Sequence, residues 1–314
     1  MPIRNRNIYS IIGPTAIGKS KIAIELVDKY PFEIISLDSS MIYREMNIGT
    51  DKPDSTILSK YKHHLIDIVD PNEDYNVFQY CKDIDIAIKE IFKNKKIPLL
   101  VGGTMMYFNA IINGLDDIPK KIPCVKDFVS DLMNKYSLKT MHNCLKDIDY
   151  DSFLRIHSND QQRIERAIEV YISSGKPLSS FFKSSSNFFD KYKFINIKLF
   201  TEDRNYIHEK IKMRTSRMFE QGLIDEVKHI IDKYPNIEKC QSMKSIGYKH
   251  IIEYLNNDLK KEHLIDRCIF ATRQLAKRQY TWMKNFSFES EIEISSTANI
   301  LKKIEKNLHL EKLM

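Results

Sequence analysis

The chain carries a complete phosphate-binding loop signature near its N-terminus. It matches the pattern G-x-x-x-x-G-K-[ST] and reads Gly13, Pro14, Thr15, Ala16, Ile17, Gly18, Lys19 and Ser20. A strand-like apolar run at 8–12 precedes it, and a helical pattern at 21–30 follows, so backbone N–H groups and a helix N-terminus can converge on one anion. We expect Lys19 to neutralise the outer phosphates and the Ser20 hydroxyl to hold a Mg²⁺ ion. The signature therefore predicts a ligand that ends in a di- or triphosphate.

A carboxylate follows the next apolar run. Asp38 comes directly after residues 33–37, which have the composition of a buried strand. Because the carboxyl ends of neighbouring strands in an open parallel sheet share one crevice, we expect Asp38 to face the phosphate-binding loop. There it would accept a proton from a substrate or help to hold the waters of the metal ion. The alternative is that Asp38 only caps the following turn, as Asp often does.

A third apolar run, at 97–101, ends in two glycines. Gly102 and Gly103 allow close approach of the backbone, which leaves the Thr104 hydroxyl and nearby N–H groups to face the same crevice. A purely structural turn is the alternative. The run does not end in the Asp with which ordinary ATPases hold Mg²⁺, and this weakens a hydrolase interpretation.

An arginine interrupts an apolar stripe in the helical pattern at 204–221. Arg214 shares one helix face with Ile211 and Met218, which lie three and four positions away. A buried guanidinium without a counter-charge is costly. We therefore expect Arg214 to meet an anion, either a bound phosphate or a carboxylate of the protein itself.

The order of these elements predicts an α/β fold. Strand-like runs alternate with helical patterns, which predicts a P-loop NTPase-like three-layer parallel sheet. The expected strands are 8–12, 33–37, 99–101 and 194–200. Between residues 116 and 193 the pattern changes to helices with short polar turns. This predicts an inserted helical subdomain at 116–193 within a catalytic core at 1–115 and 194–314. With 314 residues and 42% apolar content, the chain can bury a sizeable core.

The total charge favours a polyanionic partner only mildly, and the local distribution of basic residues favours it more. The net charge is +7, and the segment from Lys239 to Lys284 holds ten Lys and Arg against four Asp and Glu. Much of this charge lies on a predicted helix at 262–283. On a second predicted helix, at 160–173, the donors of Gln162, Arg163 and Arg166 can point at a phosphate backbone. The alternatives are a merely solvated face and pairing with the glutamates of the same helix.

Other features exclude several classes of site. The five cysteines are isolated, with no C-x-x-C pair, so neither a disulfide framework nor a zinc site is expected. The pair His63 and His64 lies beside apolar residues and is more typical of structure than of metal binding. The N-terminus runs straight into the first strand, and no apolar stretch approaches the length of a membrane span. We expect a cytoplasmic monomer that does not bind membranes.

Taken together, the motifs resemble those of the tRNA dimethylallyltransferase family, also called tRNA isopentenyltransferases. The matching pieces keep the family's order over most of the chain. They are 13–20, Asp38-Ser39 with Tyr43, Ile48-Gly49-Thr50 with Lys52-Pro53, 64–67, 101–107, Gly114-Leu115, Asn159-Asp160 with Arg163 and 166–170, Ser174-Gly175-Lys176, 222–227 and 246–248.

The resemblance implies transfer of a dimethylallyl group from dimethylallyl diphosphate to the exocyclic N6 amine of an adenine in tRNA. That adenine lies immediately 3′ of the anticodon, in tRNAs that read codons starting with U. The phosphate-binding loop of this family serves a prenyl diphosphate, not ATP. By similarity, Asp38 is the expected base, and Thr104 and Arg214 bind the diphosphate with the loop and Mg²⁺.

The resemblance also implies contacts with the tRNA anticodon stem-loop. The expected residues are Asp38, Ser39, Ser40, Met41, Thr104, Lys126, Gln162, Arg163, Ile164, Glu165, Arg166, Lys244, Ser245, Ile246, Gly247, Tyr248 and Lys249. Family members commonly carry Arg where Lys126 stands and often Gln where Met41 stands. Loop bases are the usual targets of sequence-specific RNA recognition, and the adenine must be flipped out to meet the donor.

Two other functions use the same loop. A small-molecule or nucleotide kinase would bind ATP and use Asp38 as its base, without binding RNA. A nucleotide-binding switch protein would hydrolyse its ligand slowly and bind a partner in one state only.

Overall fold

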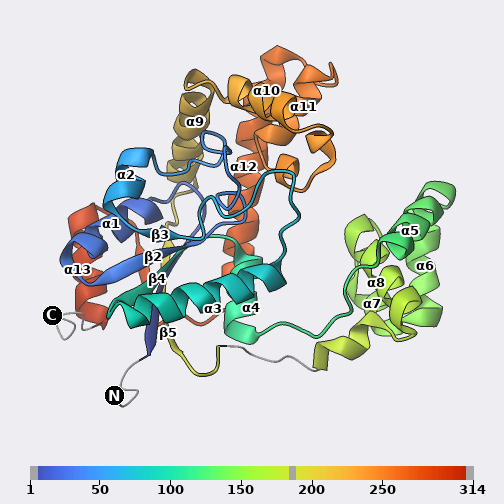
Figure 1. The fold of residues 1–314 in the computed structure, drawn as a ribbon, viewed down its shortest axis with the longest axis horizontal. Coiled ribbons are helices and arrows are strands. Elements are labelled where there is room, and N and C mark those ends of the chain that lie inside the picture. The colour runs from blue at the N-terminus through green and yellow to red at the C-terminus, as the bar shows by residue number, and fades with distance from the viewer. Residues whose placement is uncertain (1–5, 184–188, 309–314) are drawn as a thin grey trace. The chain divides into compact units, whose positions relative to one another are not determined.

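The chain forms two compact units in a computed structural model that describes residues 6–183 and 189–308 (Figure 1). One unit comprises Met1–Ile112 and Phe188–Met314, and the other comprises Asn113–Asn187. We call them the sheet unit and the helical unit. No helix of the described residues is long and apolar enough to cross a membrane.

The sheet unit is built on a six-stranded sheet whose strand pairs are all parallel. Its order is β3-β2-β4-β1-β5-β6. The strands are β1 (Asn7–Ile12), β2 (Phe32–Leu37), β3 (His63–His64), β4 (Ile97–Gly102), β5 (Lys193–Phe200) and β6 (Ser290–Glu293). The four predicted strands are confirmed as β1, β2, β4 and β5. Strands β3 and β6 are not among the predicted strands, because two and four residues are too few to show a strand period.

The register brings three loops to one edge of the sheet. Gly102 of β4 pairs with Leu37 of β2 on one side and with Ile12 of β1 on the other. The three strands therefore end level with one another. The residues that follow them are the starts of the three predicted loops, so the expected shared crevice is confirmed.

Helices cover both faces of this sheet, which confirms the three-layer fold (Figure 1). They are α1 (Lys19–Lys29), α2 (Ser55–Lys60), α3 (Val77–Lys93), α4 (Met105–Asn113), α9 (Arg204–Glu220), α10 (Leu223–Lys233), α11 (Tyr248–Leu255), α12 (Lys261–Met283) and α13 (Thr297–Leu308), with short 3₁₀ turns at Ile237–Lys239 and Ser242–Lys244. On one face, Ile34 and Leu99 share a buried cluster with side chains of α1, α9, α12 and α13. On the other face, α3 contacts β2 and β4, and the buried Tyr80 donates its hydroxyl proton to the Ser36 carbonyl at 3.0 Å.

The helical unit has its own core and, in its described part, no strand. It contains α5 (Pro123–Lys135), α6 (Leu138–Ile148), α7 (Tyr150–Arg155), α8 (Gln161–Ser174) and a 3₁₀ helix at Leu178–Lys183. Ile164, Ala167 and Ile168 of α8 are buried, as its periodicity predicts, and pack with Leu145 of α6. Side-chain caps define the helix starts: Ser137 accepts from Thr140 N, and Asp160 accepts from Arg163 N.

Candidate functional site

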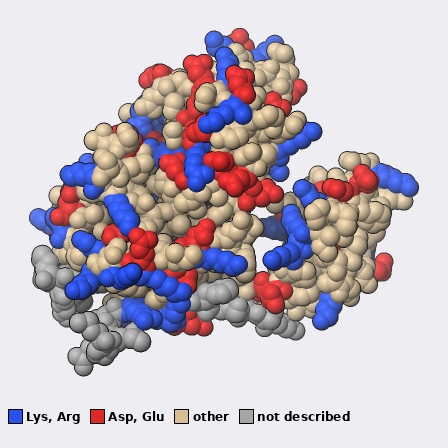
Figure 2. All heavy atoms as spheres, in the orientation of Figure 1, with Lys and Arg blue, Asp and Glu red and all other residues tan. Residues whose placement is uncertain are grey.

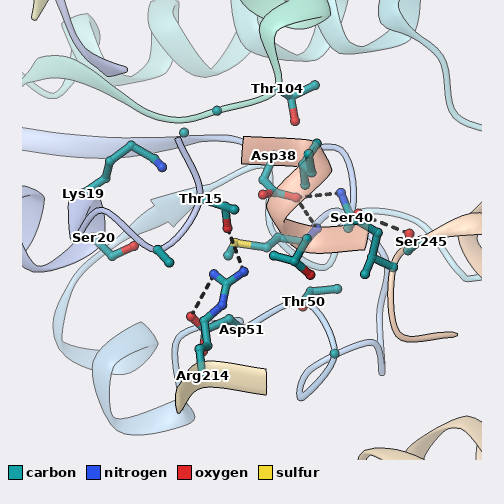
Figure 3. A pocket seen from close by; sticks show the side chains of 18 of the residues that line it. Thr15, Lys19, Ser20, Asp38, Ser40, Thr50, Asp51, Thr104, Arg214 and Ser245 are labelled. Atoms are coloured by element: carbon teal, nitrogen blue, oxygen red, sulfur yellow. Dashed lines mark hydrogen bonds and ion pairs between the residues drawn. The ribbon is translucent and has the colours of Figure 1, made fainter. Parts of the chain in front are cut away.

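A pocket of about 930 Å³ opens at the edge of the sheet where β1, β2 and β4 end (Figure 3). Its lining includes Lys19 and Ser20 of the phosphate-binding loop, Asp38, Thr104 and Arg214. The three residues expected to be catalytic therefore face the same cavity as the loop. Their chemical roles remain predictions.

The phosphate-binding loop turns directly into α1. Gly18 has a φ of 94°, a left-handed conformation that side chains with a Cβ disfavour, and α1 begins at the next residue. The first N–H groups of the helix point out of its N-terminus, where a helix dipole favours an anion. The helix is anchored by Ile22 and Leu26, and by Tyr30 at its C-cap, all of which are buried.

Lys19 is held against its own loop. Its ammonium donates to the carbonyls of Gly13 at 2.9 Å and Pro14 at 2.7 Å. Since an ammonium has three N–H donors, one is left for a ligand oxygen. Burial lowers the pKa of Lys19 to about 7; the Arg214 guanidinium acts in the same direction and Asp38 in the opposite one. Charge at this lysine therefore depends on pH in the neutral range.

The two carboxylate oxygens of Asp38 are in different situations. Oδ1 accepts from the backbone N–H groups of Ser40, at 2.8 Å, and Met41, at 3.3 Å. Oδ2 accepts no hydrogen bond from the described residues. The capping alternative is thus correct for one oxygen, and the other is free to act as a base. The two interpretations of Asp38 are compatible.

The double glycine is required by close packing. A Cβ on Gly102 would lie 2.1 Å from the Leu37 carbonyl oxygen of the neighbouring strand. Thr104 follows, and its Oγ1 accepts from the backbone N–H of Ser39 at 3.1 Å. This bond ties the loop after β4 to the loop that carries Asp38. Thr104 is therefore positioned beside Asp38, as Figure 3 shows.

Arg214 reaches the phosphate-binding loop from α9 (Figure 3). Its Nη2 donates to Thr15 Oγ1 at 2.7 Å, and its Nη1 lies 3.5 Å from Asp51 Oδ2. The buried Nε has no hydrogen-bond partner among the described residues. Ile211 and Met218 on the same helix face are buried, as predicted. The carboxylate alternative is confirmed, because Arg214 pairs with Asp51. Arg214 also lines the pocket, and its contact with a bound phosphate stays a prediction.

A glutamate that is not among the predicted site residues holds the loop of Asp51. Oxygens of Glu226, on α10, accept from the backbone N–H groups of Asn47, Ile48 and Gly49 at 3.0, 2.8 and 3.2 Å. The Tyr248 hydroxyl also donates to Glu226, at 2.6 Å. Four donors converge on one carboxylate, which fixes the loop that leads to Asp51.

A second such residue is a glutamine on α12. Gln279 is 8% exposed. Its Oε1 accepts from Thr15 N, and its Nε2 donates to the Gly103 carbonyl, both at 2.8 Å. Glu226 and Gln279 share one signal in the sequence, which is a polar residue on an apolar helix face. Each lies three or four positions from buried apolar residues of its helix, as Arg214 does.

The expected tRNA contacts in the sheet unit lie partly on the pocket. Ser39, Ser40 and Met41 line it, as do Ser245, Ile246 and Gly247. The Ser40 and Ser245 hydroxyls are hydrogen-bonded at 3.2 Å, which joins the two segments (Figure 3). Lys244 and Lys249 are exposed.

Tyr248 corrects the expectation for this segment. Its side chain is 0% exposed and bonded to Glu226, so it packs against Gly49 and offers no surface to RNA. A Cβ on Gly49 would lie 2.4 Å from its ring.

The expected contacts in the helical unit differ in exposure. Lys126, Gln162 and Arg163 are exposed, and Arg163 pairs with Asp160 at 2.6 Å. Half-buried Glu165 accepts from Gln161 at 2.7 Å. Arg166 is also half-buried; it pairs with Glu169 at 3.3 Å and donates to the Pro119 carbonyl.

Ile164 is a second correction. It is 0% exposed in the core of the helical unit, so its side chain cannot contact RNA.

Figure 2 shows basic and acidic side chains interspersed over the sheet unit, so the face in view carries no uniform basic surface.

The histidine pair has structural partners. His64 Nε2 lies 2.8 Å from Glu33 Oε2, and His63 Nδ1 lies 2.7 Å from the Tyr61 carbonyl oxygen. In the described part of the chain, no group of three or more His, Cys, Asp or Glu is arranged to hold a metal ion. These contacts support the structural interpretation of the pair.

Comparisons with known proteins agree with the site. A family model described as IPP transferase matches residues 41–286, and one described as isopentenyl transferase matches residues 6–72. The tRNA dimethylallyltransferase of Legionella pneumophila (strain Corby) is 40% identical over 307 residues, which are 97% of this chain and 98% of that protein. The one of Nitrosomonas europaea is 39% identical over 277 residues, 88% of this chain and 87% of that protein.

Solved structures give the same result. The full-length tRNA isopentenylpyrophosphate transferase of Bacillus halodurans has a TM-score of 0.67 and 32% identity, covering 98% of this chain and 100% of that one. A eukaryotic dimethylallyltransferase acting on tRNA has a TM-score of 0.76 at 24% identity, covering 98% and 77%, and supports the fold alone. The matches favour the transferase over the kinase alternative. This chain belongs to the tRNA dimethylallyltransferase family.

Proposed function

We propose that this chain transfers the dimethylallyl group of dimethylallyl diphosphate to the N6 amine of the adenine 3′-adjacent to the anticodon. The acceptors are tRNAs that read codons starting with U, and diphosphate is released. The observation that carries the proposal is one pocket that is lined both by cationic groups for the diphosphate and by a carboxylate that can act as a base. Lys19 and Arg214 supply positive charge, and Asp38 supplies a carboxylate oxygen without a partner among the described residues.

The donor side of the pocket stabilises the leaving group. Transfer breaks the bond between C1 of the donor and the diphosphate oxygen, and the electron pair stays on that oxygen. Lys19, Arg214, Thr104 and the loop N–H groups are proposed to bind this developing charge. Preorganised donors are effective here because they need not reorient as the charge grows.

The acceptor side removes a proton. The new bond forms between C1 and N6, and N6 must then lose a proton because an arylamine gaining a fourth bond becomes cationic. We assign this proton to Asp38 Oδ2, since the N–H groups of Ser40 and Met41 hold Oδ1. The bonds to Oδ1 keep the carboxylate in a fixed orientation.

The residues present suit a Mg²⁺ ion. Mg²⁺ prefers oxygen ligands, retains waters and commonly binds through substrate phosphates. The exposed Ser20 hydroxyl lies at the N-terminus of α1 and lines the pocket, so Ser20 and the diphosphate oxygens would hold the ion. When bound, Mg²⁺ neutralises part of the diphosphate charge.

The tRNA is proposed to contact both units. In the sheet unit, the segments 38–41 and 244–249 would receive the flipped adenine and its neighbours, except for the buried Tyr248. In the helical unit, exposed Lys126, Gln162 and Arg163 would contact the stem-loop backbone. We further propose that the chain acts as a monomer in the cytoplasm, where its tRNA substrate is found.

A labelling experiment tests the proposal. The chain is incubated with radiolabelled dimethylallyl diphosphate, Mg²⁺ and unmodified tRNA, and nucleosides are analysed after digestion. We expect label on N6 of the target adenine and a strong loss of label in Asp38→Asn. Absence of label together with phosphate release from ATP would support a kinase instead.

A further inference from the structure

Gln279 connects the two loops that are proposed to bind the donor. One loop contains Thr15, after β1, and the other contains Gly103, after β4. The side-chain oxygen of Gln279 accepts from Thr15 N, and its nitrogen donates to the Gly103 carbonyl, both at 2.8 Å. A backbone N–H only donates and a carbonyl only accepts, so the orientation of the amide is fixed by its partners.

The second glycine of the Gly-Gly turn makes room for this connection. A Cβ on Gly103 would lie 2.6 Å from Gln279 Nε2 and 2.9 Å from the Gly13 carbonyl oxygen. Contacts this short do not occur without displacement of one partner. The turn after β4 is therefore shaped to accept an α12 side chain between itself and the phosphate-binding loop.

The contacts of Thr15 also determine which N–H groups of the phosphate-binding loop remain for an anion. The Thr15 N–H is used by Gln279, while the Thr15 hydroxyl accepts from Arg214 at 2.7 Å. Thr15 is thus held by one side chain of α12 and one of α9. The anion is left to the N–H groups that follow Thr15 and lead into α1.

We infer that Gln279 is a positioning residue that sets the spacing between the diphosphate-binding loop and Thr104. It acts on Thr104 through the adjacent Gly103 and on the loop through Thr15. This inference rests on the proposed function, because it assigns both loops to one diphosphate. Small displacements of reacting groups are costly in catalysis, with about a hundredfold loss of rate for a shift near 1 Å.

Gln279→Met tests the inference. Met fills a similar volume but makes neither hydrogen bond, and Gln274→Met is the matched control on the half-buried surface of the same helix. Calorimetry with inorganic pyrophosphate and Mg²⁺ measures the affinity of the loop for the anion. Single-turnover transfer at saturating donor and tRNA measures the rate of the chemical step. We expect Gln279→Met to bind pyrophosphate roughly tenfold more weakly and to transfer roughly a hundredfold more slowly. The control should match the wild type.

Gln279→Glu separates positioning from simple packing. Glu keeps an acceptor for Thr15 N, but when ionised it faces the Gly103 carbonyl without a donor. Protonation restores an O–H donor, so the transfer rate relative to the wild type should rise as pH falls. This variant also serves if Gln279→Met does not fold, which thermal unfolding of both variants reports.

The outcomes distinguish the two claims. Wild-type pyrophosphate affinity and transfer rate in Gln279→Met, with only a lower Tm, would overturn the inference and leave the proposed function intact. A Gln279→Glu transfer rate, relative to the wild type, that does not change with pH would also overturn it. If the wild type binds pyrophosphate but transfers no prenyl group, the proposed function fails instead.

Discussion

The polar residues around the pocket and those on α8 are held in two different ways. In the pocket, partners come from distant parts of the chain: Arg214 to Thr15 spans 199 positions, and Gln279 to Gly103 spans 176. On α8, Arg163 and Arg166 each pair with a carboxylate three positions away. The first set is tied to the tertiary fold. On α8, exposed Arg163 is tied only to the start of its own helix, whereas half-buried Arg166 also donates to the Pro119 carbonyl.

This difference indicates what each region is suited to. A buried network holds groups at fixed distances, which is what stabilising a charge in a transition state requires. Exposed pairs such as Arg163 with Asp160 contribute little to stability and exchange partners easily. Such long side chains can follow a phosphate backbone whose exact path varies. We therefore expect pocket substitutions to reduce the rate of transfer and α8 substitutions to reduce tRNA affinity.

The largest effect is expected for the base. Asp38→Asn keeps an oxygen for the N–H groups of Ser40 and Met41 but cannot take up the N6 proton. We predict a loss of about 10²–10⁴ in kcat, with tRNA affinity nearly unchanged. Steady-state transfer and filter binding of tRNA measure the two quantities. Asp38→Ala should also lose the turn, so a drop in Tm limited to Ala would confirm that Asn leaves the loop intact, whereas full activity in Asn would remove Asp38 from the mechanism.

The next effect concerns Arg214. The variant Arg214→Lys retains the positive charge, but the lysine cannot donate to Thr15 and pair with Asp51 at once. Loss of a charge-assisted bond of about 1.5–3 kcal/mol predicts a decrease of roughly 10- to 100-fold in kcat/KM for the donor. Steady-state kinetics with varied dimethylallyl diphosphate measure it, and Arg204→Lys at the exposed start of α9 is the control. Equal decreases in both variants would show that α9 itself, not the pocket contact, is responsible.

The pH dependence of donor binding tests the half-buried Lys19. The pKa of Lys19 is about 7, well below its ordinary value, chiefly because of burial. Below pH 7 the ammonium is already charged; above pH 7 it must take up a proton before it can meet an anion. Pyrophosphate affinity should therefore fall by up to about tenfold per pH unit above 7.

Calorimetry in two buffers of different ionisation enthalpy measures that proton directly. We expect uptake approaching one proton per pyrophosphate at pH 8 in the wild type, beyond the uptake seen with Lys19→Met. Identical uptake in the two proteins would assign the proton to the ligand alone.

The sequence predicted the pocket where its signals were local. The signature at 13–20, the strand before Asp38 and the double glycine each lie within a few residues of what they position. Arg214 was found because a charged residue on an apolar helix face needs a partner. Gln279 carries the same signal, because this polar residue lies on the buried stripe of α12 with Ala276 and Met283.

What the sequence could not give was the identity of distant partners. Glu226 accepts from Ile48 across 178 positions, and no local pattern encodes that pairing. The two wrong contacts had a different cause. Ile164 and Tyr248 were included because whole segments were assigned to RNA, although helical periodicity already put Ile164 on the buried face of α8.

The smallest effect is expected on α8, where Arg163→Ala sharpens the contrast with the pocket. Its side chain is 67% exposed, so removal should leave the fold and the transfer rate at saturating tRNA unchanged. If Arg163 contacts a phosphate, KM for tRNA rises a few-fold, and the slope of log affinity against log salt falls by about one.

A titration from 50 to 200 mM salt measures that slope, with exposed Lys139→Ala on α6 as the control for general loss of charge. An equal change of slope in both variants would mean that tRNA senses the charge of the helical unit as a whole. A reduced transfer rate at saturating tRNA would contradict the comparison itself, because it would show that an exposed side chain paired only on its own helix controls chemistry in the pocket.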